Sequence, residues 1–108
     1  MSNEGNKQEV TVNEVSVHEV PAGAQFIDVR ERDEYSAGHA SGTVNFPLSE
    51  FTDYVEQINT DHDVYVICKS GGRSAKACEY LTQAIGATAF SVAGGTTAWA
   101  EAELPMER

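Results

Sequence analysis

One short stretch of the chain brings together a nucleophile, two cations and two adjacent glycines. It consists of Cys68, Lys69, Ser70, Gly71, Gly72, Arg73 and Ser74. The apolar run VYVIC, which ends at Cys68, predicts a strand buried on both faces, and helical spacing follows the stretch. Glycines tolerate positive φ and let backbone N–H groups turn inward, while the first N–H groups of a helix carry partial positive charge. The stretch therefore predicts a concave anion site around the Cys68 sulfur, lined by residues 69–74.

A thiol in such a site is expected to have a pKa below its ordinary value, because the surrounding donors stabilise the thiolate. The thiolate is the nucleophilic form, and Lys69 and Arg73 add positive charge beside it. The same donors would bind an oxyanion substrate and would stabilise a persulfide, which is also an anion. This chemistry requires no metal, nucleotide or histidine base, so no cofactor is predicted. The alternative is that Cys68 is an inert core cysteine, beside an ordinary strand-to-helix turn at Gly71 and Gly72.

Asp28 and Arg30 form a second group of interest, because alternate residues of a strand point to the same side. Both are expected near the carboxyl end of their strand, so they could act together as a functional pair. We favour a structural ion pair or hydrogen bond that anchors neighbouring loops, since polar residues at strand ends often do this. Glu34 is the expected salt-bridge partner of Arg30.

Three other residues could do chemistry but are expected to be structural. His39 could be a general acid or base, yet a preformed thiolate needs none, so a loop hydrogen bond is the favoured role. Cys78 shares a helical face with apolar residues and is expected in the core rather than as a resolving thiol. Trp99 is expected to pack the last helix rather than hold a substrate.

Short elements of alternating type must position these residues. Extended segments are predicted at 25–29, 43–46, 64–68 and 89–92, and helices at 32–36, 48–58, 73–85 and 96–103. This alternation predicts an α/β domain with a small, mainly parallel central sheet flanked by helices. Ligands of such sheets bind at the carboxyl ends of the strands, which is where Cys68 is expected.

Size and charge narrow the function further. The chain has 108 residues, which predicts a flexible polar tail at 1–10 and a single domain at 11–108. Its net charge of -10 makes nucleic acid and anionic membranes poor partners. The polar start has no apolar signal region, so we expect a cytoplasmic protein, and the acidic surface favours a monomer. The spacing of the two cysteines and three histidines predicts no metal site.

From about Glu14 to Pro105 the sequence resembles the rhodanese homology family. The matching pieces, in order, are Asp28-Val29-Arg30, Glu34-Tyr35, Gly38-His39, the segment Gly42 to Leu48, the loop Cys68 to Ser74, Gly94-Gly95 with Trp99, and Leu104-Pro105. Each piece is weak alone, but their order and spacing are specific. Ala40 follows His39 where many relatives have a bulky aliphatic residue, and this difference concerns packing rather than chemistry.

The resemblance implies a rhodanese-like domain with thiosulfate sulfurtransferase activity. Cys68 would carry the sulfur as a persulfide, and Lys69 to Arg73 would supply its cradle. Thiosulfate or a similar sulfane-sulfur compound would be the donor. Cyanide or a thiol would be the acceptor, including a protein thiol such as thioredoxin. A second hypothesis is a low-turnover persulfide carrier or interaction module that serves a partner protein.

Loop length bears on a third hypothesis, a phosphatase or arsenate reductase of the same fold. Related phosphatase-like domains have a C-x-x-x-x-x-R loop that encloses phosphate. The spacing from Cys68 to Arg73 is C-x-x-x-x-R, one residue shorter. In the family comparison the shorter loop is similar to that of the sulfurtransferases.

Overall fold

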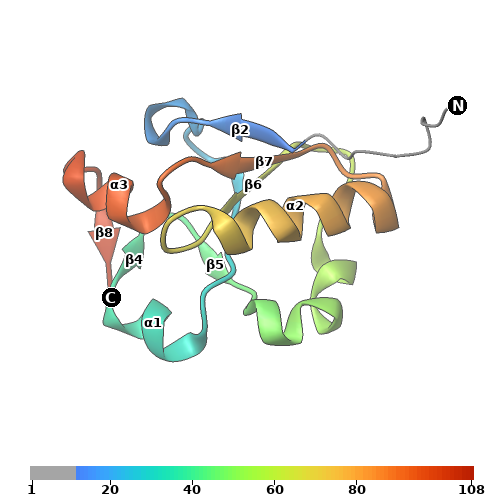
Figure 1. The fold of residues 1–108 in the computed structure, drawn as a ribbon, viewed down its shortest axis with the longest axis horizontal. Helices are drawn as coiled ribbons and strands as arrows, with labels where there is room; N and C mark the ends of the chain where they lie inside the picture. Colours follow the sequence, from blue (N-terminus) through green and yellow to red (C-terminus); the bar gives the residue numbers. More distant parts are fainter. Residues whose placement is uncertain (1–11) are drawn as a thin grey trace, which may run out of the picture.

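The computed structural model describes residues 12–108, so the predicted polar tail at 1–10 lies outside the described residues. A five-stranded sheet in the order β2-β7-β6-β3-β5 forms the centre of the molecule (Figure 1). All four of its strand pairs are parallel. Its strands are β2 (Asn13–Val15), β3 (Gln25–Asp28), β5 (Val44–Asn45), β6 (Val64–Ile67) and β7 (Ala89–Val92). The predicted α/β architecture with a mainly parallel sheet is therefore confirmed.

Strand β6 lies in the middle of the sheet, between β3 and β7. All four of its residues are buried, which explains why the run has no polar alternation. Its Val66 is paired with Ile27 of β3 on one side and with Ser91 of β7 on the other. Because these neighbours run parallel to β6, the three strands end at the same edge of the sheet.

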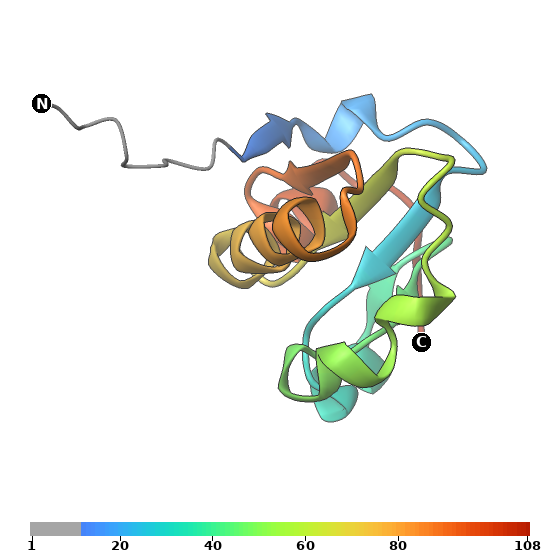
Figure 2. The same cartoon turned by 90° about the vertical axis from the view of Figure 1, so that its right-hand side faces the viewer.

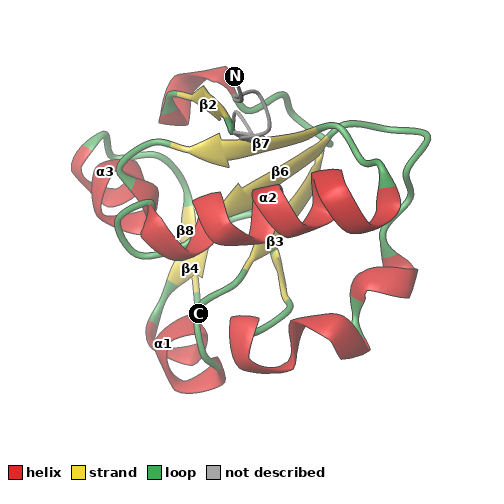
Figure 3. Ribbon diagram, turned by 45° about the vertical axis from the view of Figure 1, so that its right-hand side comes forward, coloured by secondary structure: helices red, strands yellow, loops and turns green. Residues whose placement is uncertain are grey.

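Helices cover both faces of this sheet. Helix α2 (Gly72–Ile85) lies across one face, as Figure 3 shows, and Figure 2 views it nearly end-on. Its Ala77, Cys78 and Leu81 pack against Val64 and Val66 of β6 in one apolar cluster. Helix α3 (Gly95–Glu101) and the 3-10 helix η1 (Val17–Glu19) cover the other face, where Trp99 and Val17 pack with the remaining β6 side chains. Among residues 12–108, no helix combines the length and the apolar character that a membrane span requires.

The segment predicted as one helix at 48–58 is instead two 3-10 helices, η2 (Leu48–Asp53) and η3 (Val55–Gln57). Glu50 has non-helical angles, with φ -125° and ψ 19°. Four consecutive residues at 52–55 are poor helix formers, two of them β-branched, so a continuous α-helix is disfavoured there. Two apolar residues of this segment, Phe51 and Ile58, are buried in the apolar cluster beneath α2, so the segment still contributes to the core.

The structure also contains strands that the sequence did not reveal. β4 (His39–Ala40) and β8 (Met106–Glu107) form a small antiparallel pair, and β2 at the sheet edge has three residues. Segments of two or three residues are too short to show an alternating pattern. Helix α1 (Arg32–Ala37) precedes β4 and agrees with the short helix predicted at 32–36.

Candidate active site

Cys68 lies directly after β6, at the carboxyl edge of the sheet, and helix α2 begins four residues later. Between them the chain turns back sharply, and Gly71 adopts φ 122°, which L side chains rarely tolerate. In this conformation the Gly71 backbone N–H donates a hydrogen bond to the Cys68 sulfur at 3.0 Å. The glycine is therefore required for the inward-facing amide that the sequence predicted.

The Cys68 sulfur has several polar neighbours besides Gly71. The Ser74 Oγ lies 3.4 Å from Sγ. Burial is the largest single influence on the thiol and raises its pKa. Hydrogen bonds to the sulfur lower the pKa and together outweigh the effect of burial, so the Cys68 pKa lies below its ordinary value. They come from the Ser74 hydroxyl and from the backbone N–H groups of Ser74, Gly71 and Ser70. The site thus stabilises the thiolate form more than an unperturbed cysteine environment does.

Access to this sulfur is narrow. Cys68 as a whole is only 1% exposed, whereas Lys69 and Ser70 on the outer side of the loop are exposed. The reactive atom therefore lies at the base of the loop, and the next two residues form its rim. Lys69 places a cation on this rim.

Arg73 does not point a free guanidinium at the sulfur. It donates two hydrogen bonds to Glu34 of α1, at 2.7 Å to Oε1 and 3.0 Å to Oε2. The prediction that Glu34 pairs with Arg30 was wrong, because Arg30 is already bound to Asp28. Hydrogen bonding from Arg73 lowers the pKa of Glu34 to about 2. The pair fastens α1 to the first turn of α2 and balances the charge of Arg73.

This ion pair predicts a pH-dependent contribution to stability. Replacing Glu34 with glutamine should lower the unfolding free energy by about 1 kcal/mol at pH 7, since a partly exposed pair is screened by water. A carboxyl with a depressed folded-state pKa stabilises the fold fully above its ordinary value of 4.5, and the contribution disappears as pH falls toward 2. Urea unfolding of wild type and variant between pH 7 and pH 2 measures the difference.

The control for this experiment is Glu101→Gln, which removes an exposed carboxylate from α3, the helix on the other face of the sheet. It should leave a much smaller difference across the same pH range. A wild-type advantage over Glu34→Gln that stays constant from pH 7 to pH 2 would contradict the ion-pair assignment.

Asp28 and Arg30 form a buried ion pair at the end of β3. The Arg30 Nη2 lies 2.9 Å from Asp28 Oδ2, and Nε donates to both carboxylate oxygens at 3.1 Å. The Arg30 guanidinium also donates to the Gly38 carbonyl oxygen at 2.7 Å, which ties β3 to the end of α1. These contacts agree with the favoured structural interpretation of both residues.

The start of α3 anchors the loop from behind, an interaction that the sequence analysis missed. Thr96 donates to the Cys68 carbonyl oxygen through its backbone N–H at 2.8 Å and through Oγ1 at 3.0 Å. The Thr97 N–H donates to the Lys69 carbonyl oxygen at 3.1 Å. The double glycine at 94–95 was the available signal, because Gly95 opens α3 with φ 58°.

The remaining candidates have structural positions. The Cys78 thiol is buried beside the site, and burial followed by the negative charge of Cys68 raises its pKa to about 12, so it stays protonated. His39 Nδ1 lies 2.8 Å from the Tyr35 carbonyl oxygen, and the two rings stack at 3.6 Å. Trp99 packs under the sheet and donates to the Pro105 carbonyl oxygen at 2.7 Å.

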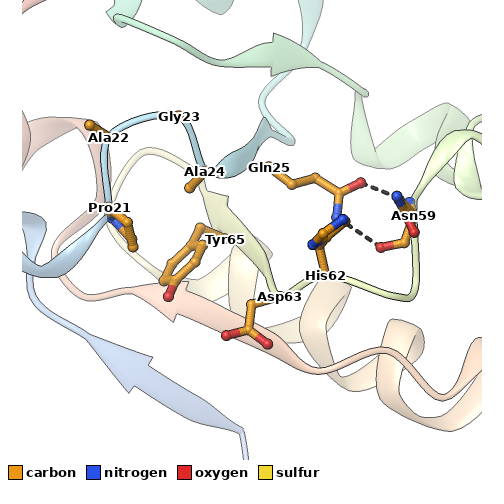
Figure 4. A pocket seen from close by; sticks show the side chains of 9 residues that line it. All are labelled: Pro21, Ala22, Gly23, Ala24, Gln25, Asn59, His62, Asp63 and Tyr65. Atoms are coloured by element: carbon orange, nitrogen blue, oxygen red, sulfur yellow. Dashed lines mark hydrogen bonds between the residues drawn. The ribbon is translucent and has the colours of Figure 1, made fainter.

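A hollow of about 460 Å³ lies at the other end of the sheet (Figure 4). It is bordered by the turn before β3 and by His62, Asp63 and Tyr65 around the start of β6. Figure 4 shows the Gln25 amide bridged to the Asn59 backbone at its side, with hydrogen bonds of 3.0 and 2.8 Å. Because it lies at the amino ends of parallel strands, this hollow is separate from the Cys68 loop.

Fold and loop together define a class of small α/β domains. Here a buried parallel strand is followed by a cysteine, and a short glycine-containing turn places a backbone amide against the sulfur before a helix begins. Residues 13–102 match the family described as the rhodanese-like domain. The chain belongs to the rhodanese-like family, and this membership supports a sulfurtransferase type of enzyme.

Individual relatives support this assignment. The chain is 36% identical over 98 residues to thiosulfate sulfurtransferase 16 of Arabidopsis thaliana, a chloroplast protein, covering 80% of this chain and 82% of that one. A rhodanese-related protein of Thermoplasma volcanium has a similar structure, with a TM-score of 0.80, 31% identity and coverage of 88% and 97%.

Other relatives are longer than this chain. Reduced CoADR-RHD of Bacillus anthracis matches with a TM-score of 0.74 and 34% identity, over 83% of this chain but 17% of that one. The chain spans 60% and 54% of two further curated relatives. The domain therefore also occurs within larger proteins.

Proposed function

We propose that the protein is a sulfurtransferase that moves sulfane sulfur from thiosulfate, or a similar donor, to cyanide or a thiol acceptor through a persulfide on Cys68. The observation that carries the proposal is the environment of the sulfur, with the Gly71 amide 3.0 Å away at the start of α2. A lowered pKa makes the thiolate available as the nucleophile. The Arabidopsis relative, which is named a thiosulfate sulfurtransferase, supports the choice of donor.

In the first half-reaction the Cys68 thiolate attacks the outer sulfur of thiosulfate. The bond between the two sulfur atoms of the donor breaks, and its electron pair leaves with sulfite. The persulfide that remains on Cys68 is an anion, and the same backbone amides that favour the thiolate would stabilise it. Lys69 on the rim would attract the doubly charged donor against the acidic surface of the chain.

In the second half-reaction an acceptor thiolate or cyanide attacks the terminal sulfur. The bond to the Cys68 sulfur breaks, its electron pair returns to Cys68 as thiolate, and the acceptor leaves as a persulfide or as thiocyanate. No net oxidant is consumed, because the sulfur keeps its oxidation level throughout. The covalent intermediate implies ping-pong kinetics.

The low exposure of Cys68 favours one alternative, a persulfide carrier for a partner protein. Cyanide is small enough to reach a sulfur at the base of a loop easily. A bulky acceptor can reach it only if its surface fits the rim formed by Lys69 and Ser70. Fast turnover with cyanide or small thiols supports the enzyme. Transfer that occurs only to a particular protein thiol, such as thioredoxin, supports the carrier.

The test is direct detection of the intermediate. Wild-type protein incubated with thiosulfate, freed of excess donor and examined by intact mass spectrometry should gain a single sulfur atom. Trypsin cleaves after Lys69, Arg73 and Lys76, so the two cysteines fall in separate peptides, 33–69 and 77–108. The added sulfur should be found in peptide 33–69 and should be lost on addition of cyanide. No added sulfur with any sulfane-sulfur donor would overturn the proposal.

A further inference from the structure

Ser91 is a polar residue on an otherwise apolar face of the sheet. It lies in β7, is 1% exposed and is paired with Val66 of β6. Ala89, two residues earlier on the same strand face, belongs to the apolar cluster beneath α2. A serine at such a position lowers stability unless its hydroxyl finds a partner. Its hydroxyl therefore needs an explanation beyond packing.

The partner of the Ser91 hydroxyl is Ser74. The two Oγ atoms are 2.7 Å apart, which is a short hydrogen bond between buried groups. Ser74 Oγ in turn lies 3.4 Å from the Cys68 sulfur and donates to the Gly71 carbonyl oxygen at 3.0 Å. Ser91, Ser74 and Cys68 thus form a continuous buried chain of polar groups, contributed by β7, by the first turn of α2 and by the end of β6.

The hydrogens along this chain are limited, because each hydroxyl has one. While Cys68 is a thiol, its S–H points at Ser74 Oγ and the Ser74 hydrogen is donated to Gly71. Once Cys68 ionises, the Ser74 hydrogen is needed at the sulfur. Because the only hydrogen of Ser74 is used at Gly71 or at the sulfur, the bond between the two serines has to use the Ser91 hydrogen. A donor at Ser74 Oγ strengthens the bond that Ser74 makes to the anion.

We propose that Ser91 is a positioning residue that acts through Ser74, orienting the Ser74 hydroxyl toward the anionic sulfur of Cys68. Ser91 does not touch the sulfur or the substrate. The inference rests on the proposed function only in that it concerns the same cysteine. The thiolate and the persulfide, both anions on the same side chain, would be stabilised in the same way.

The experiment measures thiol ionisation without any sulfur donor. The rate at which iodoacetamide alkylates Cys68 is followed against pH, and mass spectrometry of peptide 33–69 separates it from Cys78. Ser91→Ala should shift the alkylation profile to higher pH and slow the reaction at pH values below the thiol pKa roughly two- to fourfold. Ser74→Ala, which removes the direct contact, should slow it roughly tenfold or more.

A double variant distinguishes a relay from a merely structural role. If Ser91 acts through Ser74, then Ser91→Ala should have no further effect on alkylation in the Ser74→Ala background. An equal effect in both backgrounds, or an unchanged profile for Ser91→Ala alone, would overturn the inference. Because alkylation requires no sulfur transfer, a protein that fails to form a persulfide can still show the Ser91 effect, so the two proposals fail separately.

Two controls guard against changes in folding. Threonine and valine have nearly the same shape, so comparing Ser91→Thr with Ser91→Val isolates the effect of the hydroxyl. The alkylation profile of Ser91→Thr should stay close to that of wild type, whereas that of Ser91→Val should match Ser91→Ala. Thr43→Val removes another buried hydroxyl, which donates to the Ala40 carbonyl oxygen at 2.8 Å, and it should leave the profile unchanged. Equal profiles for the threonine and valine variants at position 91 would contradict the proposal.

Discussion

Cys68→Ser is expected to lower sulfur transfer at least about a thousandfold, because the variant lacks the atom on which the intermediate forms. A serine hydroxyl is nearly the same size and can accept the Gly71 hydrogen bond, so the loop should keep its conformation. Its oxygen, however, remains protonated at neutral pH and cannot hold the transferred sulfur as a persulfide. Steady-state assays with thiosulfate and cyanide, together with the intact mass after donor treatment, measure the loss.

Cys78→Ala is the matched control, because it removes the other cysteine of the chain. That thiol is buried and its pKa is raised to about 12, so at neutral pH it contributes almost no nucleophile. The variant should still form the persulfide and transfer sulfur, with a modest loss of stability from the smaller side chain. Transfer that survives in Cys68→Ser but disappears in Cys78→Ala would contradict the assignment of the sulfur carrier.

The loop could be predicted from sequence because its determinants are adjacent in the chain. A buried strand, two glycines and the start of an amphipathic helix are local patterns, and together they dictate where the amides point. Strand β6 and helix α2 were therefore predicted closely, whereas the two- and three-residue strands β2, β4 and β8 were not. The prediction of one α-helix at 48–58 was wrong. The spacing of apolar residues indicates which side chains face inward, whereas poor helix formers and tertiary contacts decide the type of helix.

Partners that are distant in sequence could not be predicted in this way. Glu34 and Arg73 are 39 residues apart in the sequence. The position of α1 against the rest of the domain decides whether the Glu34 carboxylate binds Arg73 or Arg30. Thr96 reaches the Cys68 carbonyl oxygen across 28 residues. Ser91 carried a weak signal, since a serine in a four-residue strand with three apolar neighbours invites a search for its partner. Only the packing of α2 on β7 shows that this partner is Ser74.

Gly95→Ala is expected to destabilise the fold by roughly 3–5 kcal/mol, because the added methyl group clashes with the Cys68 loop. The same clash should disturb the conformation of that loop. Gly95 has φ 58°, and a Cβ at this position would lie 2.5 Å from the Lys69 carbonyl oxygen and closer still to that of Cys68. Both atoms belong to the backbone, so neither can swing away as a flexible side chain would. Relief of the clash requires α3 to move off the loop, which breaks the hydrogen bonds that Thr96 and Thr97 donate. Urea unfolding measures the loss of stability.

Gly86→Ala separates the two components of this effect. Gly86 also has a positive φ, 67°, but an added Cβ meets nothing within 4 Å. This variant incurs only the backbone strain of a left-handed alanine, about 1 kcal/mol, and should leave the reactivity of Cys68 unchanged. Gly95→Ala should lose more stability than Gly86→Ala and should also slow the alkylation of Cys68. The difference between the two variants then measures how strongly the start of α3 holds the loop in its anion-stabilising conformation. Equal losses for the two variants would mean that the loop keeps its conformation without this contact.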